Sequence, residues 1–223
     1  MNNIMVFAPH PDDDIIGCGG SIAQHVKKGN KVSIVYMSSG DAGSLQYDKK
    51  QLAEIREQEA SRAAEVLGVK DIIFLRNPDG YIDYNRDNLI QLTSIIRTKK
   101  PDTVYVPHAQ DCVQDHITTH KLVVEACNRA AGPWFQECSG QPCPINNILG
   151  YEVWTPLPKV SYVEDISDFM ELKIAALRMH VSQLADINYD EAIKGLNRYR
   201  GMMTRRGNYC ECFEIIKIKN IGV

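Results

Sequence analysis

The sequence predicts an α/β protein with a Rossmann-like, mostly parallel, doubly wound sheet and helices on both faces. One observation is that short, β-rich apolar runs alternate with longer amphipathic segments across residues 1–131, as in parallel strands joined by helices. Another is that residues 34–37 and 72–75 are continuously apolar or aromatic, as expected of strands buried on both faces.

The first half of the chain carries the regular part of this pattern. Strands are expected at residues 4–8, 31–38, 71–75 and 103–107, and helices at residues 20–28, 50–67, 87–98 and 116–130. Gly29, Asn30 and Gly68 follow two of the helices, at positions where such residues commonly end a helix. Residues 1–131 are therefore expected to form the Rossmann-like half of the protein.

The second half, residues 132–223, is less regular. A loop is expected at residues 132–147, strands at 148–155 and 209–218, and helices at 168–183 and 190–203. The chain shows no internal repeat and no low-complexity tract. Its length suits one domain with a sizeable core, so we expect a single domain over residues 1–223.

Composition narrows the classes of partner. The chain is 44% hydrophobic and 24% charged, with a formal net charge of -3 and no basic stripe, which argues against a nucleic-acid partner. No apolar run approaches the roughly 18 residues that cross a bilayer. The N-terminus has no leader-like segment. We expect a cytoplasmic protein without a membrane span, and a homo-oligomer stays open.

Cysteine usage fits a reducing compartment. The seven cysteines are odd in number and include no Cys-x-x-Cys pair, which favours reduced thiols over a disulfide framework. Cys138 and Cys143 flank a loop-like segment, and a bridge between them stays an open alternative.

A crowded polar loop, His10-Pro11-Asp12-Asp13-Asp14, follows the first expected strand. Like charges held in one tight loop repel each other and are costly to bury. A divalent cation would offset that repulsion, and zinc accepts both imidazole nitrogen and carboxylate oxygen. The alternative is a turn whose carboxylates cap a helix, but the full cluster favours metal binding or catalysis.

A second cluster follows the fourth expected strand and contains Asp111, Asp115 and His116. Because ligands bind at the carboxyl ends of strands in open α/β sheets, both clusters should lie on one rim. Two ligands from one loop and a third from a distant segment are a usual way to build an open zinc site. Asp115 could cap the helix that follows, or it could support a ligating histidine.

Gly17-x-Gly19-Gly20 follows the first cluster and raises the alternative of a nucleotide-binding protein. The spacing does not match the G-x-G-x-x-G fingerprint. Three aspartates at the loop would also repel a pyrophosphate, so the sequence disfavours this alternative.

Taken together, these motifs resemble the LmbE / PIG-L family of zinc-dependent N-acetylglucosaminyl deacetylases. The resemblance covers nearly the whole chain. It rests on the His-Pro-Asp-Asp loop at 10–13 and the Asp-His pair at 115–116. Weaker matches are Arg56-Glu57-Gln58-Glu59, residues 63–69, Pro78-Asp79-Gly80, Asp165-Ile166-Ser167, Lys173 with His180-Val181-Ser182-Gln183, and residues 209–214.

The resemblance implies roles for individual residues. One zinc ion per chain would be held by His10, Asp13 and His116, and Asp12 would be the general base. Arg56, Asp79 and Tyr209 would contact the substrate. The residues expected around the metal ligands are Asp14, Asp111 and Asp115.

The implied activity is hydrolysis of the N-acetyl group of an N-acetylglucosamine-type sugar or glycoconjugate, with release of acetate. The second half of the chain would complete the substrate pocket.

Two positions depart from the family pattern. Asp14 stands where the loop usually ends in Glu, and Val113 replaces the first His of the second motif. That His stabilises charge or acts as an acid in family members, so His108 or His120 could take its place here. The alternative function is a weakly active or non-catalytic zinc-binding protein.

Overall fold

The computed structural model describes residues 1–185 and 187–219. Its strands are β1 (Asn3–Ala8), β2 (Lys31–Ser38), β3 (Asp71–Asn77), β4 (Thr103–Pro107), β5 (Asn147–Tyr151), β6 (Tyr162–Asp165) and β7 (Cys210–Ile218). Its helices are α1 (Asp13–Lys27), α2 (Lys49–Leu67), α3 (Arg86–Lys99), α4 (Gln114–Ala130), the 3-10 turn η1 (Ser167–Phe169), α5 (Met170–Leu177), α6 (Val181–Leu184) and α7 (Tyr189–Thr204).

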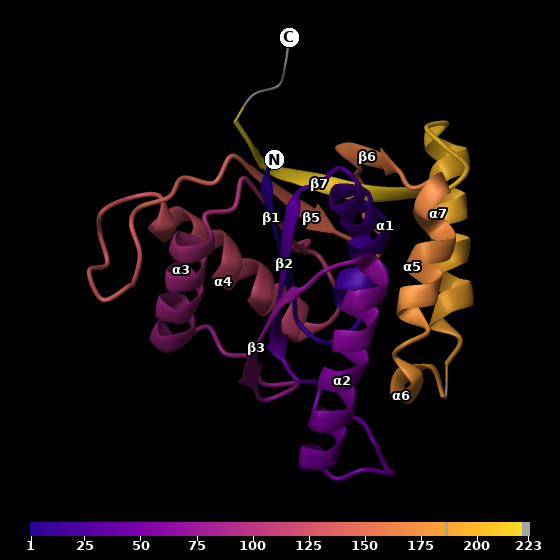
Figure 1. The fold of residues 1–223 in the computed structure, drawn as a ribbon, viewed down its shortest axis with the longest axis horizontal. Helices are drawn as coiled ribbons and strands as arrows, with labels where there is room; N and C mark the ends of the chain where they lie inside the picture. Colours follow the sequence, from indigo (N-terminus) through magenta and orange to yellow (C-terminus); the bar gives the residue numbers. More distant parts are fainter. Residues whose placement is uncertain (186, 220–223) are drawn as a thin grey trace.

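The strands form one mostly parallel sheet, as the sequence predicts. Its order is β3-β2-β1-β4-β5-β7-β6. The pairs from β3 through β5 are parallel, whereas β7 runs antiparallel to both β5 and β6. The antiparallel strands therefore lie together at one edge of the sheet (Figure 1).

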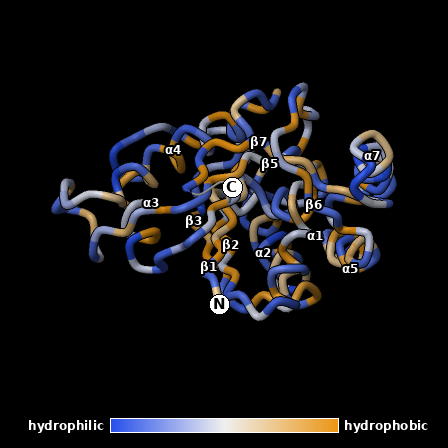
Figure 2. The backbone as a smooth tube through the Cα atoms, turned by 90° about the horizontal axis from the view of Figure 1, so that it is seen from above, coloured by the Kyte–Doolittle hydropathy of each residue, from blue (hydrophilic) through white to orange (hydrophobic). Residues whose placement is uncertain are grey.

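Helices cover both faces of the sheet. Each central strand contributes to the apolar layer on both faces, because its successive side chains point to opposite faces. In β1, Ile4 and Val6 belong to one apolar cluster, and Met5 and Phe7 belong to the other. The first cluster includes side chains of α1, α2, α5 and α7, and the second includes side chains of α3 and α4. Figure 2 shows the apolar strands β1 and β2 running between these two layers.

The boundaries of several elements in the second half differ from those predicted. The helix predicted at 168–183 is divided into η1, α5 and α6, because the backbone leaves helical geometry at His180 (φ -83°, ψ 62°). The strand predicted at 148–155 ends at Tyr151, and the next residue, Glu152, accepts a hydrogen bond from the amide of Leu157 at 2.6 Å. The four-residue β6, which is only partly buried, was not predicted. No described helix is long and apolar enough to cross a membrane.

Helix α1 begins at Asp13, seven residues before the predicted start at residue 20, and it is kinked. The kink lies at Cys18 (φ -146°, ψ 24°). In an unbroken helix, the amide of Gly20 would donate to the carbonyl of Ile16. Here the Gly20 amide donates to Glu211 Oε1 at 2.8 Å, and Lys173 Nζ donates to the Ile16 carbonyl at 2.9 Å.

The Lys173–Glu211 ion pair, with its charged atoms 2.7 Å apart, thus replaces a helical hydrogen bond. Glu211 also accepts from the amide of Ser21 at 2.8 Å, so it caps the second segment of α1 from a distant strand. The sequence prediction of a helix starting at residue 20 had identified this second segment.

The glycines near the kink serve packing. A Cβ atom at Gly17 would overlap the ring of Tyr151, and one at Gly20 would lie 2.7 Å from Cβ of Ile166. These contacts explain the Gly17-x-Gly19-Gly20 run without a nucleotide.

Candidate active site

The two predicted His/Asp clusters meet at the carboxyl ends of adjacent parallel strands. The loop after β1 carries His10 and leads into α1, and the loop after β4 leads into α4, whose first turn carries His116. Because β1 pairs directly with β4, the two loops lie side by side. This is the rim at which the sequence places the site.

Asp12 holds an unusual backbone conformation at the start of α1. Its φ is 124°, a value that residues with a Cβ atom seldom adopt. Its carbonyl accepts from the amides of Ile15 and Ile16 at 3.0 and 2.9 Å, which helps fix the turn. Backbone strain of this kind gathers at functional sites, where the surrounding structure maintains it.

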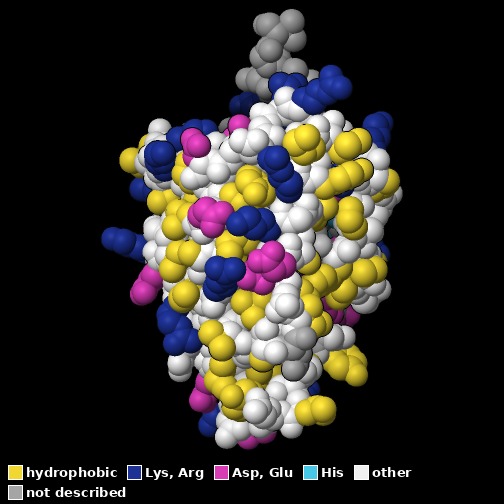
Figure 3. Space-filling view, turned by 90° about the vertical axis from the view of Figure 1, so that its right-hand side faces the viewer, with side chains coloured by type: hydrophobic (Ala, Val, Ile, Leu, Met, Phe, Trp, Pro, Cys, Tyr) yellow, Lys and Arg dark blue, Asp and Glu magenta, His cyan; other side chains and the backbone are white. Residues whose placement is uncertain are grey.

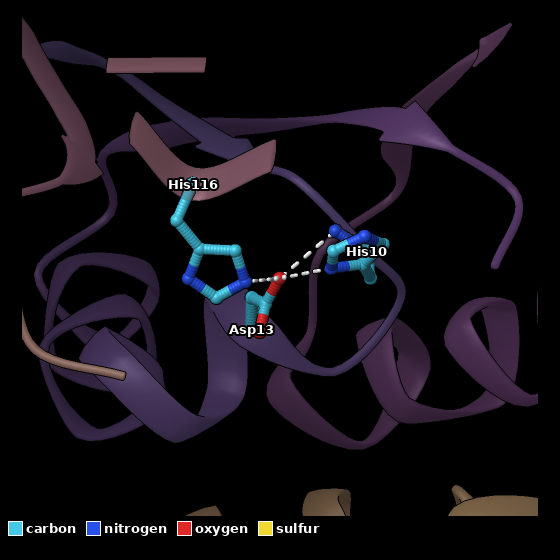
Figure 4. Close-up of side chains that lie close together, drawn as sticks. All are labelled: His10, Asp13 and His116. Atoms are coloured by element: carbon cyan, nitrogen blue, oxygen red, sulfur yellow. Dashed lines mark hydrogen bonds and ion pairs between the residues drawn. The ribbon is translucent and has the colours of Figure 1, made fainter. Parts of the chain in front are cut away.

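Asp13 lies between two imidazole rings (Figure 4). Its Oδ2 is 3.2 Å from Nδ1 of His10 and 3.3 Å from Nε2 of His116. The same oxygen accepts from the backbone amide of His10 at 2.9 Å. One ligand atom from each of the three residues can be chosen so that all lie within 4.8 Å of one another.

The donor set fits a divalent cation. Both ring nitrogens of His116 are buried and form no hydrogen bond among the described residues, although Nε2 lies 3.3 Å from Asp13 Oδ2 and Nδ1 lies 3.6 Å from Asp111 Oδ2. Buried polar groups without good hydrogen bonds are costly unless another ligand satisfies them. Two imidazoles and one carboxylate are a ligand set that zinc accepts, with a further position left for water.

Three more carboxylates hold the histidines. Nε2 of His10 lies 3.0 Å from Oδ1 of Asp79 and 3.2 Å from Oδ2 of Asp115. Nδ1 of His116 lies 3.6 Å from Oδ2 of Asp111. Carboxylates at the far nitrogen of a ligating histidine fix its orientation and tautomer.

Asp115 therefore supports His10, from the other cluster, rather than its sequence neighbour. Its oxygens also accept from the amides of Gly80 and Ile82 at 2.8 and 3.2 Å. It does not cap α4, whose N-cap residue is Val113. His10, Asp79 and Asp115 form a second group with metal-ligand spacing, but it uses the nitrogen of His10 that faces away from Asp13.

Burial and neighbouring charges move the pKa values of this cluster in opposite directions. Burial raises the pKa of Asp12 to about 7, although the Arg56 guanidinium opposes the shift. Burial also raises the pKa of Asp14 to about 7, against the hydrogen bond from Tyr36. For Asp13, burial is outweighed by the two histidines, so its pKa lies well below the usual range.

His116 shows the complementary effect. Burial lowers its pKa, but the charge of Asp13 and the contact with Asp111 outweigh burial and raise the pKa to about 9. In the metal-free chain, Asp13 and Asp111 therefore favour the protonated form of His116.

Arg56 supports the loop and also lines the pocket described below. Its Nη2 donates to the carbonyl of Pro11 at 2.8 Å and lies 3.5 Å from Oδ2 of Asp12. Its Nη1 donates to the carbonyl of Gly40 at 3.3 Å. The guanidinium is thus buried against the carboxylate that the sequence assigns as general base.

A small pocket of about 140 Å³ opens onto the cluster. It is lined by His10, Asp12, Asp13, Arg56, Asp79, Trp154, Gln183 and Tyr189. The last three come from the second half of the chain and were not assigned from the sequence. Gln183 ends the His180–Gln183 motif, which was a weak signal, whereas Trp154 and Tyr189 carried none.

Other predicted residues are not brought to this pocket. The Tyr209 ring packs against the cluster of Ile166, Met170 and Ile174. Arg198 lies over its other side, 5.5 Å from the ring centroid.

Asp14 faces the core, where it accepts from the hydroxyl of Tyr36 at 3.1 Å. It contacts neither predicted histidine ligand in the hydrogen bonds and ion pairs of the described residues.

His108 and His120, which could replace the histidine missing at Val113, both contact the backbone. His108 Nε2 lies 2.7 Å from the carbonyl of Thr155, and its Nδ1 accepts from the amide of Gln110 at 3.1 Å. His120 Nδ1 lies 2.8 Å from the carbonyl of Pro107. Both rings contact backbone atoms, and neither lines the pocket.

Cys138 and Cys143, for which the sequence leaves a disulfide bridge open, are free thiols in the structure.

Comparisons with known proteins agree on a family. Residues 5–127 match the family model "PIG-L: GlcNAc-PI de-N-acetylase". The chain is 31% identical over 195 residues to a diacetylchitobiose deacetylase from Thermococcus kodakarensis, covering 83% of this chain and 72% of that protein.

Solved structures show the same fold. An N,N'-diacetylchitobiose deacetylase from Pyrococcus horikoshii superposes with a TM-score of 0.87 at 30% identity, covering 96% of this chain and 84% of that one. GalB, a 4-carboxy-2-hydroxymuconate hydratase from Pseudomonas putida KT2440, reaches the same TM-score of 0.87 at 22% identity, over 100% and 99% of the two chains. This last likeness concerns the fold alone, because one fold can carry different chemistries.

The family match covers more than half of the chain and includes both clusters of the site. The relative from Thermococcus kodakarensis extends the likeness to most of its length. This chain is a member of the PIG-L family of deacetylases.

Proposed function

We propose that this chain is a zinc-dependent hydrolase that removes the N-acetyl group of an N-acetylglucosamine-type sugar or its conjugate and releases acetate. The observation that carries the proposal is the His10–Asp13–His116 set, in which one ligand atom from each residue can be chosen so that all three atoms lie within 4.8 Å of one another. Family membership supports the same chemistry, since the matching model is that of a GlcNAc-PI de-N-acetylase.

In this proposal, His10, Asp13 and His116 hold one zinc ion per chain. When bound, zinc would activate water and polarise the acetyl carbonyl. Asp12 lines the same pocket and takes the proton of the attacking water. It then returns the proton to the leaving amine, because no histidine stands at position 113 to do so.

The remaining residues prepare these groups. Asp79 and Asp115 orient His10, and Asp111 orients His116. Arg56 favours the carboxylate form of Asp12, because its Nη2 lies 3.5 Å from Asp12 Oδ2. Trp154, Gln183 and Tyr189 close the pocket from the second half, so we also propose that residues 1–223 act as a single domain.

The alternative is a zinc-binding member of the family with little or no activity. It is favoured by Val113, and by the finding that neither His108 nor His120 reaches the pocket. Metal analysis together with acetate release from N-acetylglucosamine conjugates separates the two, since zinc without acetate would support the alternative.

Asp12 and Asp13 should have separable roles. Asp12→Asn should keep zinc and lower the rate of acetate release by about 10²–10⁴-fold, as expected for loss of a general base. Asp13→Asn should instead lower zinc content, because it removes a ligand. Zinc retention by Asp13→Asn together with zinc loss in Asp12→Asn would reverse the assignment.

A further inference from the structure

The small pocket continues into a larger groove. The groove measures about 780 Å³ and shares Gln183 and Tyr189 with the pocket. The pocket itself, at about 140 Å³, is below the roughly 300–1,000 Å³ of small-molecule sites. It has room for the reacting group, and the rest of a substrate must lie beyond it.

The walls of the groove come from three segments. One wall is the loop between β2 and α2 with Leu45 and Tyr47, another is one side of α2 with Leu52 and Ile55, and the third is α6 with the segment leading to α7. The walls are held together, because Glu59 of α2 accepts from the amide and hydroxyl of Ser182 at 2.8 and 2.6 Å.

Its described lining is apolar at the rim and carries almost no charge. Leu45 is fully exposed, and Val181 and Ile187 are 65% and 52% exposed. Glu59 is the one charged side chain among the described lining residues, and both of its oxygens are engaged by Ser182. No Lys or Arg lines the described part of the groove.

Figure 3 shows the face of the molecule that carries α5 and α7. Acidic and basic side chains lie next to one another near its centre, and hydrophobic side chains are spread over much of the face, including its right-hand side and its lower part. Exposed apolar surface beside a catalytic pocket is commonly a binding groove.

We propose that this groove binds the aglycone of the substrate, and that it selects a neutral aglycone with an apolar face over one that bears a carboxylate. The inference rests on the proposed function, because it takes an N-acetylglucosaminide as the occupant. An anionic aglycone would find no cation among the described lining residues, and it would lose hydration without gaining an ion pair.

Matched ligands test the proposal directly. Methyl, benzyl and 4-carboxybenzyl glycosides of N-acetylglucosamine differ only in the aglycone. Their dissociation constants can be measured by calorimetry on zinc-loaded protein carrying Asp12→Asn, which limits turnover. The benzyl glycoside should bind about tenfold tighter than the methyl glycoside, and the added carboxylate should remove most of that gain.

Variants locate the preference. Leu45→Glu and Val181→Glu should each bring the benzyl-to-methyl ratio close to one. Met202→Glu, at an exposed position on α7 away from the groove, should leave the ratio as it is. The same ratio in kcat/KM, measured with chains that keep Asp12, provides a second reading that does not depend on the Asp12 substitution.

A ratio near one in the parent chain would overturn the inference, and so would a ratio that both groove variants leave unchanged. Sedimentation should show the same oligomeric state for all variants. A change of oligomeric state in Leu45→Glu with an unchanged ratio would mean that the face joins copies of the chain. If the chain that keeps Asp12 releases no acetate from any of these glycosides but the binding preference is present, the proposed function is refuted and the assignment of the groove still holds.

Discussion

Two clusters of buried charge differ in how completely their polar atoms are satisfied. At the Lys173–Glu211 pair, the ammonium group has three acceptors, which are the Ile16 carbonyl, Asn197 Oδ1 and Glu211 Oε1. An ammonium group has three donors, so none is left over. At the His10–Asp13–His116 cluster, the ring nitrogens of His116 form no hydrogen bond among the described residues, and they have only ion-pair contacts of 3.3 and 3.6 Å with Asp13 and Asp111.

This difference matches different roles for the two clusters, because one holds chain segments together and the other can bind a ligand. A closed network of buried charges has no capacity left for a ligand and holds chain segments together. A cluster with unpartnered atoms is costly to fold, and it keeps those atoms available for binding. Helix α1 connects the two clusters, because its first turn carries Asp13 and its second segment begins at the Glu211 carboxylate.

Breaking the closed network should have the largest effect. Lys173→Met would leave the Glu211 carboxylate buried without its cation, which should lower the free energy of unfolding by about 3–5 kcal/mol. Urea denaturation of the metal-free protein measures it. The double variant Lys173→Met/Glu211→Gln should recover part of the loss, since it removes the buried charge. A loss below about 1 kcal/mol in the single variant would contradict the role given to this pair.

Removing a residue of the His10–Asp13–His116 cluster should affect metal binding more than folding. His116→Ala should lower zinc affinity by about a hundredfold or more. Its metal-free stability should fall by less than that of Lys173→Met, because Asp13 keeps its contact with His10 when the His116 ring is removed. Zinc titration and urea denaturation measure the two effects. Unchanged zinc affinity would remove His116 from the proposed ligand set.

The pH dependence of the free energy of unfolding should show a smaller effect, which comes from His25 in α1. Burial, with a contribution from Lys28, lowers the pKa of His25 to about 4, whereas its ordinary value is 6.5. Between pH 4 and 6.5, His25 therefore binds a proton in the unfolded chain but not in the folded chain. The free energy of unfolding falls as the pH drops from 6.5 towards 4.

His25→Gln should make the stability of the metal-free protein less dependent on pH in this window. The difference in slope should be at most about 1.4 kcal/mol per pH unit, the value for one proton. Equal slopes for the two proteins, from urea midpoints between pH 4 and 7, would show that His25 takes up its proton in the folded state.

Periodicity identified the elements of the first half to within two residues at each end, except for the start of α1. The way this helix begins shows why. A local pattern predicted a helix from residue 20, because the preceding residues are a polar loop followed by glycines. The chain becomes helical already at Asp13 and is kinked at Cys18. Lys173 and Glu211, from α5 and β7, bind the backbone groups that the kink leaves without a helical partner.

The sequence by itself determined the mostly parallel sheet and the two His/Asp loops at its rim. Strand alternation and strand-end motifs are local properties, and parallel topology brings the strand ends together. Only the tertiary structure decided which carboxylate supports which histidine: Asp115 reaches His10, and Asp111 reaches His116. It also placed Trp154, Gln183 and Tyr189 at the pocket and kept Tyr209 away, because packing of the irregular second half depends on contacts between residues far apart in the chain.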